Sequence, residues 1–272
     1  MTTDYSTDCV IASDDTRLHV SESGSGEDVL FIPALGYASW CWHRQIKPVS
    51  DVARVLLMDN RGTGLSGKPT APYSIAQMAD DAYEVLRQRG NGPAHVVGAS
   101  MGGYIAQSLA LRHPDAVKSL VLIATTSGGP GSRPVPMETQ RAWAAAVPLG
   151  SAGFARATMP LSFAPGWAQD HPEEFEKLLA LRLRSPTPTA CWRLQYTAAA
   201  TFLRRGLPRG EVTQPTVIVH GTADRVVPYE NAAHLARRLP HAKVVTLHDA
   251  GHLCWIEQDD VVNDIVRAVV CA

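Results

Sequence analysis

Three residues in this sequence have the types that nucleophilic catalysis by a serine needs: Ser100, Asp224 and His252. A serine hydroxyl is a poor nucleophile at neutral pH, so it needs a base beside it, and the base needs an acid that orients it. The order serine, aspartate, histidine along the chain is one of the known orders of such a triad. The sequence therefore predicts Ser100 as nucleophile, His252 as base and Asp224 as orienting acid.

Each of these three residues closely follows an apolar run of strand length. The carboxyl ends of parallel strands meet at one edge of a sheet, which is where sites form in open α/β sheets. A lone histidine or aspartate in a loop is more often an ordinary surface residue, but three candidates at equivalent positions favour a common site. The runs, in the same order, are His95–Val97, Thr216–Val219 and Lys243–Leu247.

The segment around the serine has the pattern Gly-x-Ser-x-Gly, with Gly98 and Gly102 on either side of Ser100. A chain that turns from strand to helix within a few residues brings backbone segments too close for Cβ atoms, so the flanking positions must be small. The helical spacing over Tyr104–Arg112, which ends before Pro114, supplies the helix. Although the pattern alone also occurs in ordinary turns, this context is typical of a nucleophile elbow.

Asp249 is the alternative to Asp224 as the orienting acid, because it lies only three residues before His252. It shares a tight loop with the histidine, however, and would have to fold back on it. Asp224 comes from a separate strand end at the same predicted edge of the sheet. We therefore favour Asp224.

A tetrahedral oxyanion intermediate requires N–H donors aimed at the negative oxygen. One predicted donor is the backbone N–H of Met101, the residue after the nucleophile. The other is predicted in the loop Pro33–Gly36, which follows the first apolar run, and the N–H of Leu35 is its best candidate.

Strand-length apolar runs alternate with helical segments over most of the chain. Because the strands are continuously apolar, they imply a mostly parallel sheet covered by helices on both faces, which is an α/β fold. Asp8–Ala12 and Arg17–Glu22 predict a preceding hairpin. The remaining strands are predicted at Val29–Ile32, Arg54–Met58, His95–Val97, Ser119–Ile123, Thr216–Val219 and Lys243–Leu247. The helices are predicted at Ser74–Arg89, Tyr104–Arg112, Glu230–Leu239 and Asp260–Val270.

The alternation breaks between Ile123 and Thr216, where proline-punctuated segments of helical pattern replace strands. We interpret this stretch as an inserted helical cap. The predicted division is residues 1–126 for the first part of the core, 127–211 for the cap and 212–272 for the second part of the core. Helices within the cap are predicted at Met137–Ala146, Pro172–Arg184 and Thr189–Leu203.

The composition is that of a soluble globular protein, with 45% hydrophobic and 19% charged residues among 272. A net charge of −1 without blocks of like charge gives no indication of nucleic acid or an anionic membrane as a partner. No apolar run is long enough to span a membrane, and Met1–Asp15 lacks the pattern of a signal peptide. The five cysteines are scattered, which favours reduced thiols in the cytoplasm.

The chain resembles the α/β-hydrolase superfamily, in the branch that contains 3-oxoadipate enol-lactonase, small carboxylesterases, polyketide methylesterases and cofactor-free haloperoxidases. Besides the elbow, the resemblance rests on Asp59–Ser66, His220–Asp224 and Gly251-His252, and it covers the predicted core. We interpret Asp59–Ser66 as a structural turn. The oxyanion loop of the family commonly begins His-Gly, whereas this chain has Pro33-Ala34 there, so the shape of the oxyanion hole is expected to differ.

Together, these residues and the resemblance imply a serine hydrolase that cleaves a small-molecule carboxylic ester, lactone or thioester through an acyl-enzyme. No metal or organic cofactor is expected. Carbon–carbon bond hydrolases and cofactor-free perhydrolases use the same triad, and some relatives act as ligand-binding receptors, so these alternatives stay open. A cap arginine such as Arg182 could bind a substrate carboxylate, but solvated helix faces are the expectation for these residues. The substrate pocket is expected to involve the tryptophans Trp40, Trp143, Trp167 and Trp192.

Overall fold

Eight strands form one sheet in the order β1-β2-β4-β3-β5-β6-β7-β8. The computed structural model describes residues 6–272. Residues 1–5 lie outside the described residues; they are the start of the predicted segment 1–126 and of the stretch that lacks a signal-peptide pattern. β1 pairs antiparallel with β2, as the predicted hairpin requires, and β2 pairs antiparallel with β4. All other pairs are parallel, so the predicted α/β class is confirmed. The strands are β1 Ser6–Ile11, β2 Arg17–Gly24, β3 Asp28–Ile32, β4 Arg54–Met58, β5 Ala94–Ala99, β6 Val117–Ile123, β7 Thr216–Gly221 and β8 Lys243–Leu247.

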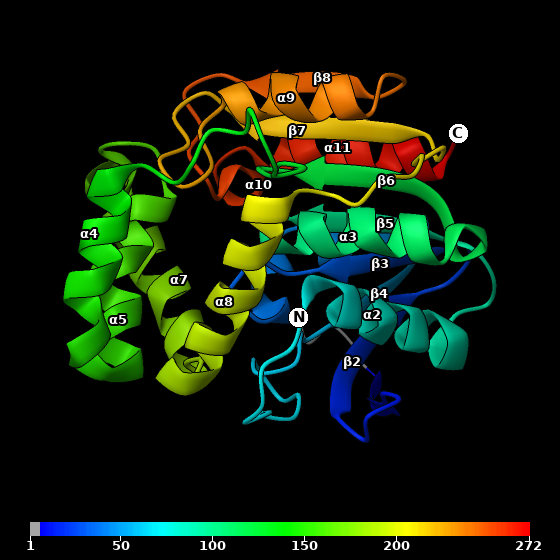
Figure 1. Ribbon diagram of the computed structural model, residues 1–272, viewed down its shortest axis with the longest axis horizontal. Helices are drawn as coiled ribbons and strands as arrows, with labels where there is room; N and C mark the ends of the chain where they lie inside the picture. Colours follow the sequence, from blue (N-terminus) through cyan, green and yellow to red (C-terminus); the bar gives the residue numbers. More distant parts are fainter. Residues whose placement is uncertain (1–5) are drawn as a thin grey trace.

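Alternate residues of the central strands point to opposite faces of the sheet, and both faces are covered. Leu30 and Ile32 of β3 belong to one core, with α2, α3 and α9, whereas Val29 and Phe31 belong to the other, with α1, α10 and α11. Figure 1 shows α2 and α3 in front of the sheet and α11 behind it. The core helices are α1 Ile46–Ser50, α2 Ile75–Arg89, α3 Met101–Arg112, α9 Glu230–Arg238, α10 Cys254–Glu257 and α11 Asp259–Val270.

The segment between β6 and β7 is helical, as predicted, and its α-helices, α4 to α8, are called the cap below. In Figure 1, α4, α5 and α7 lie beyond the left-hand end of the sheet. The sequence did not predict α5, which contains two glycines; burial of Phe154 overrides its weak helical propensity. No helix among the described residues is long and apolar enough to cross a membrane. The cap helices are α4 Met137–Ala146, α5 Gly150–Thr158, α6 Trp167–Asp170, α7 Pro172–Arg184 and α8 Thr189–Arg205.

The turn after β4 is held by a buried arginine, as expected of a structural segment. Arg61 is 2% exposed, and its Nε and Nη2 donate to the two carboxylate oxygens of Asp81, both at 2.6 Å. Its Nη1 donates to Asp14 at 2.8 Å, and this contact holds the pKa of Asp14 well below its usual range. A two-pronged pairing of this kind suits the planar guanidinium, and it joins the turn to α2 and to the β1–β2 hairpin.

Candidate active site

Ser100 occupies a strained turn between β5 and α3. Its φ of 51° and ψ of −117° lie outside the regions that non-glycine residues favour. A Cβ on Gly98 would lie 2.4 Å from the carbonyl oxygen of Gly102, and one on Gly102 would lie 2.1 Å from that of Ile32. The backbone is therefore too close at both flanking positions for a Cβ, as the sequence analysis predicted. The strained turn presents the Ser100 side chain to a cavity.

The structure brings His252 and Asp224 together, as predicted. His252 Nδ1 lies 2.8 Å from Asp224 Oδ2, and both side chains are buried. The backbone N–H groups of Val226 and Val227 donate to Asp224 Oδ1 at 2.7 and 2.8 Å, which fixes the carboxylate from its other side. An Nδ1–H that donates to the carboxylate leaves His252 Nε2 as the basic nitrogen.

The buried carboxylate of Asp224 is held in its charged form. Burial by itself would raise its pKa, but the positive charge of His252 and the hydrogen bonds from His220 and His252 hold this pKa well below its usual range. His220 Nε2 lies 3.3 Å from Asp224 Oδ2. An ionised acid at this position favours an imidazole that points at it and stabilises the imidazolium once formed.

Asp249, the alternative acid, has a different environment. Its side chain is exposed, and its backbone N–H donates to Thr222 Oγ1 at 2.9 Å. Its φ of 58° marks it as a turn residue. The geometry thus favours Asp224 over Asp249 as the partner of His252.

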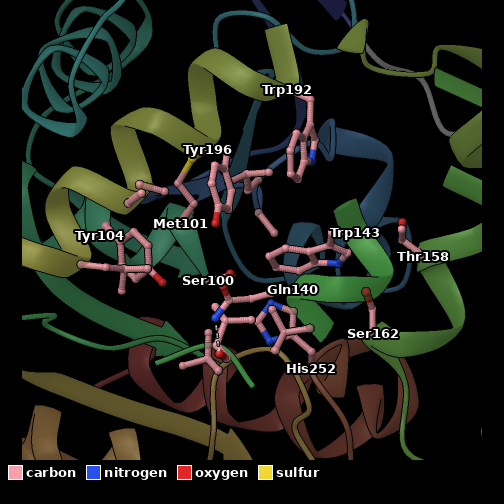
Figure 2. A pocket seen from close by; sticks show the side chains of 18 of the residues that line it. Ser100, Met101, Tyr104, Gln140, Trp143, Thr158, Ser162, Trp192, Tyr196 and His252 are labelled. Atoms are coloured by element: carbon pink, nitrogen blue, oxygen red, sulfur yellow. Dashed lines mark hydrogen bonds between the residues drawn. The ribbon is translucent and has the colours of Figure 1, made fainter. Parts of the chain in front are cut away.

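A cavity of about 320 Å³ lies between the carboxyl edge of the sheet and the cap. Ser100 and His252 line it, and Figure 2 shows them together on its floor. Leu35 and Met101 line it as well, and among the described residues neither backbone N–H has a hydrogen-bond acceptor. Two free N–H groups beside a serine are the arrangement that an oxyanion needs.

The loop that carries Leu35 is held by two amide side chains that the sequence analysis did not single out. Asn60 Nδ2 donates to Pro33 O at 3.0 Å. Gln195 of α8 accepts from the Gly36 N–H at 2.8 Å and donates to Arg61 O at 2.9 Å. Among the loop residues only Gly36 takes a positive φ, so Pro33 and Ala34 fit the loop without strain.

Two of the four predicted pocket tryptophans line the cavity. Trp143 and Trp192 form part of its wall, with ring centroids 6.1 Å apart, and Figure 2 shows both. The other two, Trp40 and Trp167, are not among the residues that line it. Trp40 packs on Tyr37, while Trp167 stacks on Phe163 at 4.2 Å, so each fills space within the protein instead.

The expectation that Arg182 lies on a solvated helix face is wrong. This residue of α7 is only 7% exposed and lines the cavity, whereas its neighbour on the same helix, Arg184, is exposed. Residues two positions apart on a helix point in different directions, but the helical period does not show which face α7 buries.

Among the described residues, no group of three or more histidine, cysteine, aspartate or glutamate side chains is arranged to hold a metal ion.

The sheet order and the strained turn at Ser100 are those of an α/β hydrolase. The family described as alpha/beta hydrolase fold matches residues 29–259, so the chain belongs to this family. It is 28% identical over 257 residues to the putative carbamate hydrolase RutD of Azorhizobium caulinodans, covering 93% of this chain and 94% of that protein. It is 27% identical over 269 residues to 3-oxoadipate enol-lactonase 2 of Acinetobacter baylyi, covering 96% and 95%.

Among solved structures, the esterase EaEST from Exiguobacterium antarcticum has the same fold, with a TM-score of 0.83 at 22% identity. The match covers 97% of this chain and 99% of that one. The resemblance stated from the sequence motifs is thereby confirmed at the level of the family.

Proposed function

We propose that this protein is a serine hydrolase that cleaves a carboxylic ester, lactone or thioester of a small molecule through an acyl-enzyme. The observation that carries the proposal is the 2.8 Å hydrogen bond between His252 Nδ1 and Asp224 Oδ2 at a cavity that Ser100 also lines. In this proposal residues 127–211 act as the cap that covers the site, and the reaction needs no cofactor.

Acylation begins when Ser100 Oγ bonds to the carbonyl carbon of the substrate and its proton passes to His252 Nε2. The N–H groups of Leu35 and Met101 hold the resulting oxyanion, and the Asp224 carboxylate stabilises the imidazolium. The tetrahedral intermediate then collapses. The bond to the leaving oxygen or sulfur breaks, and that atom takes the proton from His252.

Deacylation repeats these steps with water as the nucleophile. His252 Nε2 takes one proton from the water as its oxygen bonds to the acyl carbon, and the same two N–H groups hold the second oxyanion. Collapse of this intermediate releases the carboxylic acid and returns the proton to Ser100 Oγ. The enzyme is regenerated, and one water is consumed for each bond that is cleaved.

The relatives support a reaction at a carbonyl carbon. One is named as an enol-lactonase, another as a carbamate hydrolase, and a structure of the same fold as an esterase. All three names describe hydrolysis of an acyl group that is bound to oxygen or nitrogen.

The test is hydrolysis of a p-nitrophenyl ester series, from acetyl to decanoyl, by the wild type and by Ser100→Ala. We expect repeated turnover by the wild type, its loss in the variant, and a chain-length optimum set by the cavity. Inertness of the wild type toward the whole series would overturn the proposal for simple esters. A single burst of one product per protein, without turnover, would favour a ligand-binding receptor.

A further inference from the structure

Arg182 is a buried cation that the proposed reaction does not use. It lies on α7, lines the cavity and is 7% exposed. Its guanidinium carbon lies 4.5 Å from the centre of the Tyr37 ring. Its two hydrogen bonds both leave from Nη1, to Tyr37 Oη at 3.2 Å and to Ala155 O at 3.5 Å. Among the described residues, Nε and Nη2 have no acceptor.

Among the residues that the structure describes, no aspartate or glutamate forms an ion pair with Arg182. A buried charge is normally paired, because the loss of its hydration is costly. Arg61, which is similarly buried, has two carboxylate partners. The guanidinium of Arg182 therefore lacks the anion that its burial requires, and the edge formed by Nε and Nη2 suits a two-pronged contact with a carboxylate.

The cavity as a whole carries positive charge. Arg182, Arg133 and Arg204 line it, and none of the described lining residues is an aspartate or a glutamate. Arg133 and Arg204 are exposed, so they act at the entrance as screened charges, whereas Arg182 acts in the interior, where screening is weak.

Arg182 lies in a polar corner of an otherwise aromatic cavity. Tyr37 Oη, which accepts from Arg182, lies 3.3 Å from Ser162 Oγ, and both of these residues line the cavity. Tyr37 follows the oxyanion loop directly, and its backbone N–H donates to Ala34 O at 3.1 Å. Tyr37 thus connects this polar corner to the loop that carries the predicted oxyanion-hole donor Leu35.

We propose that Arg182 binds a carboxylate of the substrate, so that the enzyme acts on esters, lactones or thioesters that carry a second, free carboxylate besides the bond that is cleaved. This proposal rests on the proposed function for the reaction itself. Arg182 is then a residue that determines specificity: it contacts the substrate away from the reacting carbonyl, with Tyr37 orienting its guanidinium.

The test compares p-nitrophenyl hydrogen adipate, which carries a free carboxylate, with its methyl ester, in which that carboxylate is blocked and uncharged; release of p-nitrophenol is measured for both. The measured quantity is the ratio of kcat/KM for the charged ester to kcat/KM for the neutral one. A hydrogen-bonded ion pair in a cavity changes such a ratio by about 10- to 100-fold, so we expect Arg182→Met to lower it by that factor. An unchanged ratio in Arg182→Met would overturn the proposal.

Two further variants separate charge recognition from structural damage. Arg182→Lys keeps the charge but loses the planar fork, so its ratio is expected between those of the wild type and Arg182→Met. Arg184→Met removes an exposed arginine two residues further along the same helix, and its ratio is expected to equal that of the wild type. Equal loss of the ratio in Arg184→Met would mean that only the general charge of the cap matters, which also contradicts the proposal.

A binding measurement makes the result independent of catalysis. Calorimetric titration of Ser100→Ala with adipate and with adipamide, its neutral counterpart, is expected to show tighter binding of adipate. This preference should disappear when Arg182→Met is added. If adipate binds in this way but the wild-type protein cleaves no ester, the carboxylate site is supported and the proposed reaction is overturned. Ester cleavage without charge preference or adipate binding would overturn the carboxylate site alone.

Discussion

The carboxyl edge of the sheet and the cap each bury an arginine against the rest of the protein, but the two residues have opposite environments. Arg61, at the sheet edge, donates to Asp81 and Asp14, so its charge is fully neutralised within the fold. Among the described residues, Arg182, in the cap, donates hydrogen bonds to a tyrosine and a backbone carbonyl and pairs with no carboxylate. The charge of the sheet-edge arginine is thus neutralised by the fold, whereas the arginine of the cap is left for an anionic group of a ligand to neutralise.

The sheet edge and the cap also differ in their proposed roles, which are catalysis for the edge and substrate specificity for the cap. The residues proposed to make and break bonds come from the sheet edge, and the wall that faces them comes largely from the cap. Substitutions at the edge should therefore lower turnover of every substrate by a similar factor. Substitutions in the cap should change the order in which substrates are preferred.

The largest expected effect is that of Ser100→Ala. Without the nucleophile no acyl-enzyme forms, so kcat should fall by about 10⁶-fold for charged and neutral esters alike. The measurement is steady-state hydrolysis of both esters, with thermal melting to verify the fold. Ser108→Ala, on α3 and outside the cavity lining, is the matched control and should keep its activity. A loss that differed strongly between the two esters would contradict the claim that residues of the sheet edge affect all substrates equally.

The next effect is that of Asp224→Asn, which leaves the geometry nearly unchanged but removes the charge that orients His252. We expect kcat to fall by about 10⁴-fold. Asp249→Asn is the control, because this exposed side chain lies in the same loop as His252 and should change kcat little. The reverse pattern in steady-state kinetics would transfer the role of orienting acid to Asp249.

The comparison of the two arginines predicts different effects on stability. Arg61→Met leaves the buried Asp81 carboxylate without its cation, so the free energy of unfolding should fall by about 3–5 kcal/mol. Arg182→Met removes a charge that has no carboxylate partner within residues 6–272, so it should cost little or even stabilise the protein. Urea denaturation of both variants measures these changes. A large loss in Arg182→Met would mean that Arg182 is a structural residue like Arg61.

The smallest expected effect concerns Glu257, which joins the two regions. Its carboxylate accepts from the N–H of Gly251, beside His252, and from the N–H of Ala164 in the segment between α5 and α6. Burial raises the pKa of Glu257 to about 7, from 4.5 for an unperturbed glutamate. Between these two pH values the folded protein binds a proton that the unfolded chain has released. The contribution of Glu257 to the free energy of unfolding should therefore decrease as pH rises through this window.

Glu257→Gln removes this titration. The difference in free energy of unfolding between the wild type and Glu257→Gln should accordingly shift against the wild type from about pH 5 to about pH 8. Urea denaturation at both pH values measures the shift. A difference that stays constant, or moves in favour of the wild type, contradicts the buried protonated state.

Most strands of the core and the longer helices of the core and cap were predictable because their signals are local. The bounds of β4, β8, α4 and α7 match the predicted segments, and β7 continues only two residues past its predicted end. The glycines around Ser100 were recognisable since the turn there leaves no room for a Cβ. The short helix α5 was not predicted, because only its packing against the rest of the cap offsets its glycines.

Local patterns in the sequence were sufficient to predict the strands, the elbow and three candidate residues at one edge of the sheet. Parallel strands end at a common edge, and a tight strand-to-helix turn allows few residue types. The packing of the cap, which local patterns do not show, places Trp143 and Trp192 rather than Trp40 and Trp167 at the cavity and buries Arg182 there. The physical reason is that helical periodicity shows which residues share a face, but not which face packs inward. That choice depends on how α7 and α8 pack over the sheet edge, far from them in sequence.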